Sequence, residues 1–136
     1  MNVEGACHCG NIAYEAEVDP NGVGICHCTD CQVLSGSPYR SAVGAVAHTF
    51  RLLRGTPKIY VKIADSGERR AHAFCPDCGA PVYSAEADSP ITYALRVGAL
   101  KQRLDLKPRR QIWTQRALPW SNDLTNIPGF QGQPES

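Results

Sequence analysis

The sequence has little that would direct the protein to a membrane or to a polyanionic partner. Its 136 residues carry 14 Lys and Arg against 13 Asp and Glu, a formal net charge of +1. Nucleic-acid-binding proteins usually show a marked basic excess or a basic stripe, so we expect no nucleic-acid partner. No apolar run approaches the roughly 20 residues that a membrane-spanning helix needs. We therefore expect no membrane association.

The first residues also lack the features of an export signal. They have no basic start and no apolar segment, so no secretory signal peptide is expected. The cysteines number seven, which is odd, and an odd set without an export signal is typical of the reducing cytoplasm. We predict a cytoplasmic protein whose thiols bind metal rather than pair as disulfides.

Short segments of alternating apolar and polar residues dominate the remaining chain, with turn signals between them. The clearest strand candidates are residues 11–18, 39–47, 58–63, 69–74, 81–84 and 91–98. Turns are expected at 19–22, 54–57 and 65–68, and one short helical turn at 30–34. The sequence therefore predicts a mainly β fold that forms one domain over residues 1–136. We expect its tail, residues 105–136, to pack on the core through Trp113, Trp120 and Phe130.

The cysteines form an outer pair, a central trio and a second outer pair. Cys75 and Cys78 are a C-x-x-C pair followed by Gly79, the spacing of a zinc knuckle. Cys7 and Cys9 are a C-x-C pair, and on a strand both sulfurs would point to one side. Together the outer pairs would complete a closed Cys₄ site, which is typical of structural zinc.

The central trio, Cys26, Cys28 and Cys31, is left without a fourth cysteine. Three protein ligands with one position free is the arrangement of catalytic zinc, so we predict a second zinc there and two zinc ions per chain. His27 lies between two of these ligands and is expected to point away from the metal as a packing neighbour. Spacing alone leaves two alternatives open. Cys7 and Cys9 can pair with the trio instead, and the trio can be a metal-free or redox thiol centre.

Charge favours one class of chemistry at such a trio. Three thiolates around Zn²⁺ make the metal a weaker Lewis acid than three imidazoles would, so capture of a soft ligand is expected over strong activation of water. An incoming thiol is such a ligand. We therefore expect thiol chemistry.

The order C-x-C-G, C-H-C-x-x-C and F-C-x-x-C-G resembles the glutathione-dependent formaldehyde-activating enzyme family, which also includes centromere protein V. The resemblance extends to Gly36, to Arg96-Val97-Gly98-Ala99-Leu100, and to the tail from Gln111-Ile112-Trp113 through Trp120 to Phe130. It implies an Mss4-like fold of small antiparallel sheets. It also implies a structural zinc on Cys7, Cys9, Cys75 and Cys78 and a catalytic zinc on Cys26, Cys28 and Cys31.

The implied activity is that of a carbon–sulfur lyase acting on S-hydroxymethylglutathione, the adduct of glutathione and formaldehyde, or on a related small thiol substrate. The implied partner is therefore a small thiol or thiol–aldehyde adduct. A non-enzymatic zinc-binding module and a redox or metal-sensing thiol protein are the alternatives. The strand edges of a small β domain leave homodimer formation open.

This sequence departs from the family at Gln32, where many relatives carry an Arg that can meet a substrate carboxylate. Gln supplies no charge, and Arg40 is expected to lie on the surface rather than to replace it. By their chemistry, His27, His48 and Asp30 are candidates for a general acid or base. His72 is a weaker candidate because strand alternation places it on the face of Phe74.

Overall fold

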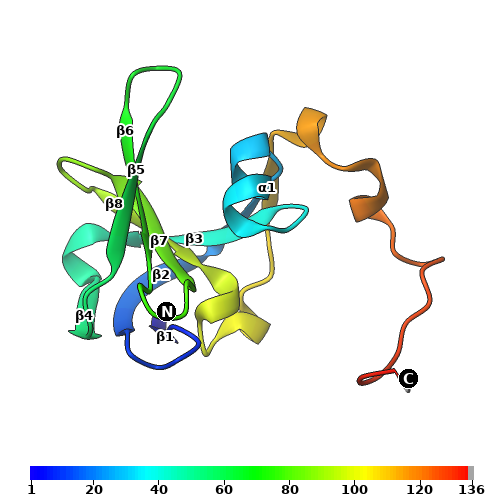
Figure 1. Ribbon diagram of the computed structural model, residues 1–136, viewed down its shortest axis with the longest axis horizontal. Helices are drawn as coiled ribbons and strands as arrows, with labels where there is room; N and C mark the ends of the chain where they lie inside the picture. The colour runs from blue at the N-terminus through cyan, green and yellow to red at the C-terminus, as the bar shows by residue number, and fades with distance from the viewer. Residues whose placement is uncertain (135–136) are drawn as a thin grey trace.

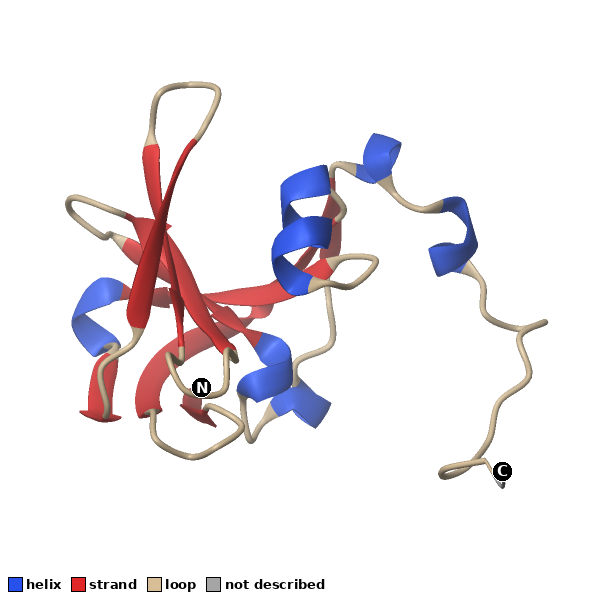
Figure 2. Ribbon diagram, viewed as in Figure 1, coloured by secondary structure: helices blue, strands red, loops and turns tan. Residues whose placement is uncertain are grey.

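The computed structural model of the protein describes residues 1–134, and most of its regular structure is antiparallel β-sheet (Figures 1 and 2). The strands are β1 (Asn2–Ala6), β2 (Ala13–Cys26), β3 (Arg40–Val46), β4 (Arg51–Arg54), β5 (Lys58–Ile63), β6 (Arg69–Phe74), β7 (Pro81–Glu86), β8 (Thr92–Arg96) and β9 (Arg110–Ile112). The α-helix is α1 (Thr29–Ser35). Short 3₁₀ turns are η1 (Ala47–Thr49), η2 (Val97–Ala99), η3 (Arg103–Asp105), η4 (Thr114–Arg116) and η5 (Pro119–Asn122). The predicted mainly β fold is confirmed.

The long strand β2 pairs with four other strands along its length. Its first half pairs with β1 and β4, and its second half pairs with β3 and, in parallel, with β9. From β3 the sheet continues through β8, β7 and β6 to the edge strand β5. The trio of cysteines therefore lies at the end of a strand that is held on both sides, by β3 and by β9.

The turn expected at residues 19–22 is a bulge within β2 rather than an interruption of it. Between Val18 and Val23 the register with β3 shifts, and the backbone N–H of Asn21 bonds Asp19 Oδ1 at 2.9 Å. Such an Asx turn lets the local turn residues bulge outward while the strand resumes its pairing. The predicted local turn is therefore present. Because β2 pairs with β3 both before and after this turn, β2 remains a single strand.

The apolar core occupies one face of this sheet. Its fully buried members include Val23, Val43, Val82 and Leu95, which come from four different strands. Phe50 stacks on Tyr93 with ring centroids 4.5 Å apart and extends the core toward η1. The other face, which carries Cys26, is covered only in part, by α1.

The tail does not pack as the sequence predicted. Leu106 is buried and β9 pairs with β2, but Trp113, Trp120 and Phe130 are 52%, 56% and 69% exposed. Trp113 adopts a left-handed φ of 57°, and the chain then leaves the sheet (orange to red in Figure 1). The two turns that follow, η4 and η5, are too short to carry these aromatic side chains back to the core. Residues 135–136 of the predicted tail lie outside the described part of the chain.

Across residues 1–134, no helix combines the length and apolar character needed to cross a membrane.

Candidate metal centres

The two outer cysteine pairs meet in space, as the sequence predicted. The sulfurs of Cys7, Cys9, Cys75 and Cys78 all lie within 4.8 Å of one another. Cys7 and Cys9 belong to the turn between β1 and β2, and the other two to the turn between β6 and β7. The C-x-C pair is thus on a turn rather than on the expected strand, because the Gly10 N–H bonds the Cys7 carbonyl oxygen at 3.2 Å and closes the chain on itself.

Backbone amides surround the buried sulfurs of this group. The Ile12 N–H donates to Cys7 Sγ at 3.2 Å, and the Asp77 N–H to Cys75 Sγ at 3.4 Å. The Gly79 N–H bonds the Cys75 carbonyl oxygen at 2.9 Å, and Gly79 has a φ of 77° that favours glycine. Asn11 Nδ2 donates to Asp77 Oδ2 at 2.8 Å and ties the two turns together.

The acid–base properties of these thiols show how well they suit a cation. The Ala80 backbone amide, followed by that of Cys9, lowers the pKa of Cys78 to about 6. For Cys9 the Asn11 amide acts downward, but desolvation and the three neighbouring thiols prevail and raise its pKa to about 12. Thiols this close cannot all ionise without a compensating charge. A tetrahedral, thiolate-binding dication such as Zn²⁺ supplies that charge, so the donor set fits zinc.

The trio Cys26, Cys28 and Cys31 forms a second group, again with all sulfurs within 4.8 Å. Cys26 ends β2, Cys28 is the N-cap of α1, and Cys31 lies in its first turn. The Cys31 N–H donates to Cys28 Sγ at 3.3 Å, so the sulfur takes the place of the usual capping oxygen. All three side chains are half-buried, so the group is accessible from solvent.

His27 faces away from the trio into the protein. It is 2% exposed, its Nε2 lies 2.7 Å from Gln111 Oε1 on β9, and its ring meets Tyr39 edge-on. The backbone N–H of His27 donates to the Ile112 carbonyl oxygen at 3.1 Å. His27 therefore links the trio loop, residues 26–31, to β9.

Gln32 also fastens the trio loop. Its Nε2 donates to the carbonyl oxygens of His27 at 2.8 Å and of Arg116 at 3.0 Å. The amide therefore links α1, the trio loop and the start of the tail. The sequence analysis noted Gln32 only because it lacks the charge of an Arg, but in the structure its side chain has a structural role.

The acid–base candidates are scattered. Asp30 is exposed and pairs with Lys62 Nζ at 2.5 Å, beside Cys28 in a cavity of about 550 Å³. His48 lies in η1 and lines a separate polar cavity with Glu15 and Glu17. His72 lines a third cavity, and desolvation, followed by the charges of Arg40 and Arg96, lowers its pKa to about 4.

That third cavity corrects the prediction for Arg40. It has a volume of about 590 Å³, and Arg40 lines it with Arg96, His72 and Phe74 instead of lying on an open surface. Sequence reasoning assigned no role to Arg96. The sequence did indicate which face Arg96 occupies. Ile91, Tyr93, Leu95 and Val97 alternate as the apolar face of the strand, so Arg96 lies on the opposite, polar face. The neighbours of Arg96 on that face depend on which strands pair with its own strand, and the sequence does not reveal this pairing.

Comparisons with known proteins agree with this geometry. A crystal structure of a Rhodobacter sphaeroides protein superimposes with a TM-score of 0.62 at 23% identity, covering 79% of this chain and 98% of that one. No curated protein matches the sequence. The family model described as glutathione-dependent formaldehyde-activating enzyme matches residues 2–116, which include all seven cysteines. The chain belongs to the glutathione-dependent formaldehyde-activating enzyme family.

Proposed function

We propose that the protein is a zinc-dependent enzyme of the carbon–sulfur lyase type that acts at the Cys26, Cys28 and Cys31 trio. Its substrate is a thiol–aldehyde adduct such as S-hydroxymethylglutathione or a related small thiol adduct. One observation carries the proposal. The seven cysteines separate into a four-sulfur group and a three-sulfur group, and no further Cys, His, Asp or Glu of residues 1–134 joins the trio.

The four-sulfur group has the structural role in this proposal. Its ligands come from the β1–β2 and β6–β7 turns, which lie far apart in the sequence. Cys7 and Cys75 are buried and belong to the apolar core. Four protein sulfurs fill a tetrahedral coordination sphere, so they leave no position for a substrate.

The trio has the reactive role. When bound there, zinc would offer one free position to the substrate sulfur and would lower the pKa of that thiol. In the direction of synthesis the thiol sulfur forms a bond to the aldehyde carbon, the carbonyl π electrons move to oxygen, and that oxygen gains the proton that the thiol loses. Splitting the adduct reverses each change. The chain holds the three sulfurs in place through the α1 cap and through the pairing of β2 with β3 and β9.

Asp30 and Lys62 line a cavity together with Cys28, and Asp65 and Arg116 line it as well. The Asp30 carboxylate is exposed and pairs with the half-buried Lys62 ammonium group, so the pair can exchange protons with solvent. We assign this pair to proton transfer to and from the adduct oxygen. Asp30→Asn should then slow adduct formation without releasing zinc from the trio.

Zinc content, thiol titration and turnover together test the proposal. The protein should hold two zinc ions per chain and accelerate adduct formation between formaldehyde and a small thiol above the spontaneous rate. Cys28→Ala should lose one zinc and the acceleration but keep the native circular dichroism. Cys28→His, which restores a donor atom, should recover part of the zinc binding.

Two results would contradict the enzyme assignment. One zinc with three freely titrating thiols would identify the trio as a redox or sensing centre. Two zinc ions without any acceleration across a panel of thiols and aldehydes would leave a non-enzymatic zinc-binding module. The cytoplasmic location, the single-domain organisation and the homodimer stay predictions.

A further inference from the structure

Strand pairing places two arginines next to the trio. Residues directly opposite one another in antiparallel strands share a face of the sheet. Cys26 pairs with Arg40, and two residues farther along β3, Ala42 pairs with Arg96. Because side chains alternate along a strand, all four of these residues lie on the same face. The two arginines are therefore neighbours of the trio on that face.

The same face continues across the sheet to its edge. Ala94, two residues before Arg96, pairs with Ser84, which pairs with His72, which in turn pairs with Tyr60 on β5. The middle of the row thus carries only Ala and Ser side chains, between long side chains at both ends. The ends of this row, with Arg96 on one side and His72 and Tyr60 on the other, line a hollow of about 590 Å³, whereas Ala94 and Ser84 do not line it.

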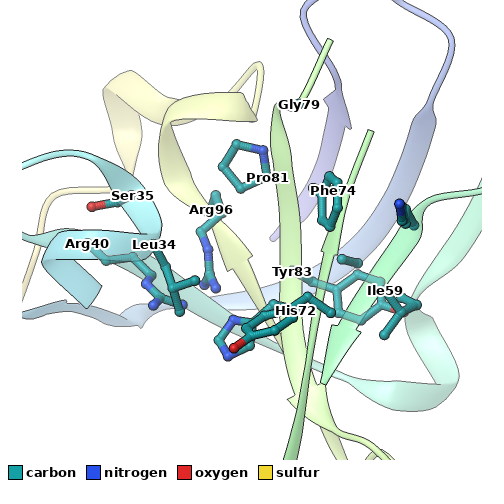
Figure 3. A pocket seen from close by; sticks show the side chains of 13 residues that line it. Leu34, Ser35, Arg40, Ile59, His72, Phe74, Gly79, Pro81, Tyr83 and Arg96 are labelled. Carbon is teal, nitrogen blue, oxygen red and sulfur yellow. The ribbon is translucent and has the colours of Figure 1, made fainter. Parts of the chain in front are cut away.

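Helix α1 closes one side of this hollow. Leu34 and Ser35, one turn beyond Cys31, form a wall of the 590 Å³ cavity. The remaining wall is largely apolar or aromatic and includes Tyr60, Phe74 and Pro81, with Lys58 beside Phe74 as its cation. Figure 3 shows the arginine side chains and the His72 ring converging beside Leu34, with Phe74 and Pro81 farther along the strands. The cavity therefore has two arginines near the trio and a largely apolar far part that Lys58 borders.

The two arginines of this cavity have no carboxylate partner among residues 1–134. Other arginines of the sheet do, since Arg51 pairs with Glu15, Arg69 with Asp88 and Arg70 with Glu86. Arg96 donates only to the Ala94 carbonyl oxygen, at 3.1 Å. Both arginines are half-buried, and partly desolvated like charges side by side are unfavourable without an anion.

We propose that this cavity binds a small carboxylic acid with an apolar body, the carboxylate lying between Arg40 and Arg96. Two planar guanidinium groups suit a carboxylate because each can donate two parallel hydrogen bonds. The apolar body then packs against Tyr60, Phe74 and Pro81, which line the rest of the cavity. His72 is neutral at pH 7, since its pKa is about 4, so the arginines supply the charge.

This assignment narrows the substrate of the proposed reaction, and in that respect it rests on the proposed function. Arg40 is the direct pairing partner of Cys26, so the carboxylate site adjoins the metal centre. A substrate that reaches both carries its carboxylate only a few bonds from its sulfur. Glutathione differs, because peptide linkages or a longer chain separate both of its carboxylates from the sulfur. The geometry therefore favours an apolar 2- or 3-sulfanylcarboxylic acid.

Binding of a probe without sulfur tests the cavity separately from the reaction. 3-Phenylpropionate and its neutral counterpart 3-phenylpropan-1-ol are titrated into the zinc-loaded protein by calorimetry at pH 7.5. The acid should bind at least about tenfold more tightly than the alcohol, as hydrogen bonds between charged partners predict. Arg40→Gln and Arg96→Gln should each remove most of this preference, whereas Arg40→Lys should keep part of it.

Arg109→Gln is the matched control, because it removes the same charge from an exposed side chain outside the cavity. It should leave the preference unchanged. Equal binding of acid and alcohol by the wild-type protein would overturn the proposal, as would a preference that survives in both cavity variants. If Arg96→Gln does not fold, Arg40→Gln decides the question, supported by loss of the preference at high salt.

The substrate class is tested in parallel. With formaldehyde, 2-sulfanyl-3-phenylpropanoate should be accelerated more than glutathione, and Arg40→Gln should raise its KM more than it lowers kcat. An acid preference in the binding assay without any acceleration would refute the proposed reaction while leaving the anion site in place. Acceleration of glutathione that Arg40→Gln does not alter would refute the narrowed substrate and spare the reaction.

Discussion

Gln32 donates a hydrogen bond from Nε2 to the carbonyl oxygen of His27 at 2.8 Å. The same amide nitrogen bonds the carbonyl oxygen of Arg116 at 3.0 Å. The trio loop, α1 and the start of the tail are therefore joined at one side chain.

We predict that Gln32→Glu loosens the trio loop. A carboxylate cannot donate to either carbonyl oxygen, and it brings negative charge close to three sulfurs. The loss of bonds to two acceptors should lower the free energy of unfolding by about 1–3 kcal/mol. Urea denaturation measures this change, and chelator competition should show faster loss of one zinc. Gln115→Glu, on an exposed tail side chain, should change neither, and equal effects of both substitutions would contradict the role of Gln32.

Cys78→Ala should prevent stable folding. Cys78 holds the β6–β7 turn to the turn after β1 through the four-sulfur group, and structural zinc typically contributes on the order of 10 kcal/mol to folding. The expected result is insoluble protein or a chain without a cooperative thermal transition. Removing zinc from the wild-type protein with a strong chelator should have the same effect. A soluble, cooperatively folding Cys78→Ala protein with one zinc would show that this group is not the structural site.

His72 should make the protein less stable as the pH falls below 6.5. Desolvation, with the charges of Arg40, Arg96, Arg70 and Lys62, lowers the folded-state pKa of His72 from 6.5 to about 4. The unfolded chain then binds the proton first, so stability is fully present above pH 6.5 and is lost as the pH falls toward 4.

The measurement for His72 is the melting temperature from pH 7.5 to pH 4.5. The wild-type value should fall faster with pH than that of His72→Gln, which cannot titrate. Zinc release at low pH affects both proteins, so their difference isolates the histidine. Parallel pH profiles would show that His72 gains its proton as easily in the folded protein as in the unfolded chain.

Gly5→Ala should strongly destabilise the protein. A Cβ at Gly5 would overlap the ring of Tyr14, which lies opposite it on β2 and is fully buried. Overpacking of this kind costs about 1–3 kcal/mol because the ring or the strand must shift. Thermal unfolding measures the loss, and Gly98→Ala, where a Cβ meets no atom within 4 Å, is the matched control. Equal stability of the two variants would mean that Tyr14 moves at little cost.

The strands were predictable where alternation was strong. Residues 58–63 and 69–74 form β5 and β6 within the predicted bounds, and the helical turn expected at 30–34 lies inside α1. The tail was not predictable from its composition. Tryptophan and phenylalanine usually indicate a core, but after Trp113 the chain turns away from the sheet. Apolar character shows that a side chain would gain from burial, and only the path of the chain decides whether it reaches the core.

The sequence by itself determined the spacing of the thiols within each cysteine cluster, and the order of the clusters matched a known family. It left open whether Cys7 and Cys9 share an ion with the trio or with the second outer pair, and the meeting of the β1–β2 and β6–β7 turns decided this. Only the tertiary structure decided what lies beside the clusters. Arg40 and Arg96 are 56 residues apart in number, yet β3 and β8 pair through Ala42 and Arg96 and bring both arginines to one cavity. Strand register is a long-range property, since it depends on how whole strands bury their apolar faces. The trio follows from local spacing, whereas the four-sulfur group and the cavity of Arg40 and Arg96 follow from the way distant strands pair.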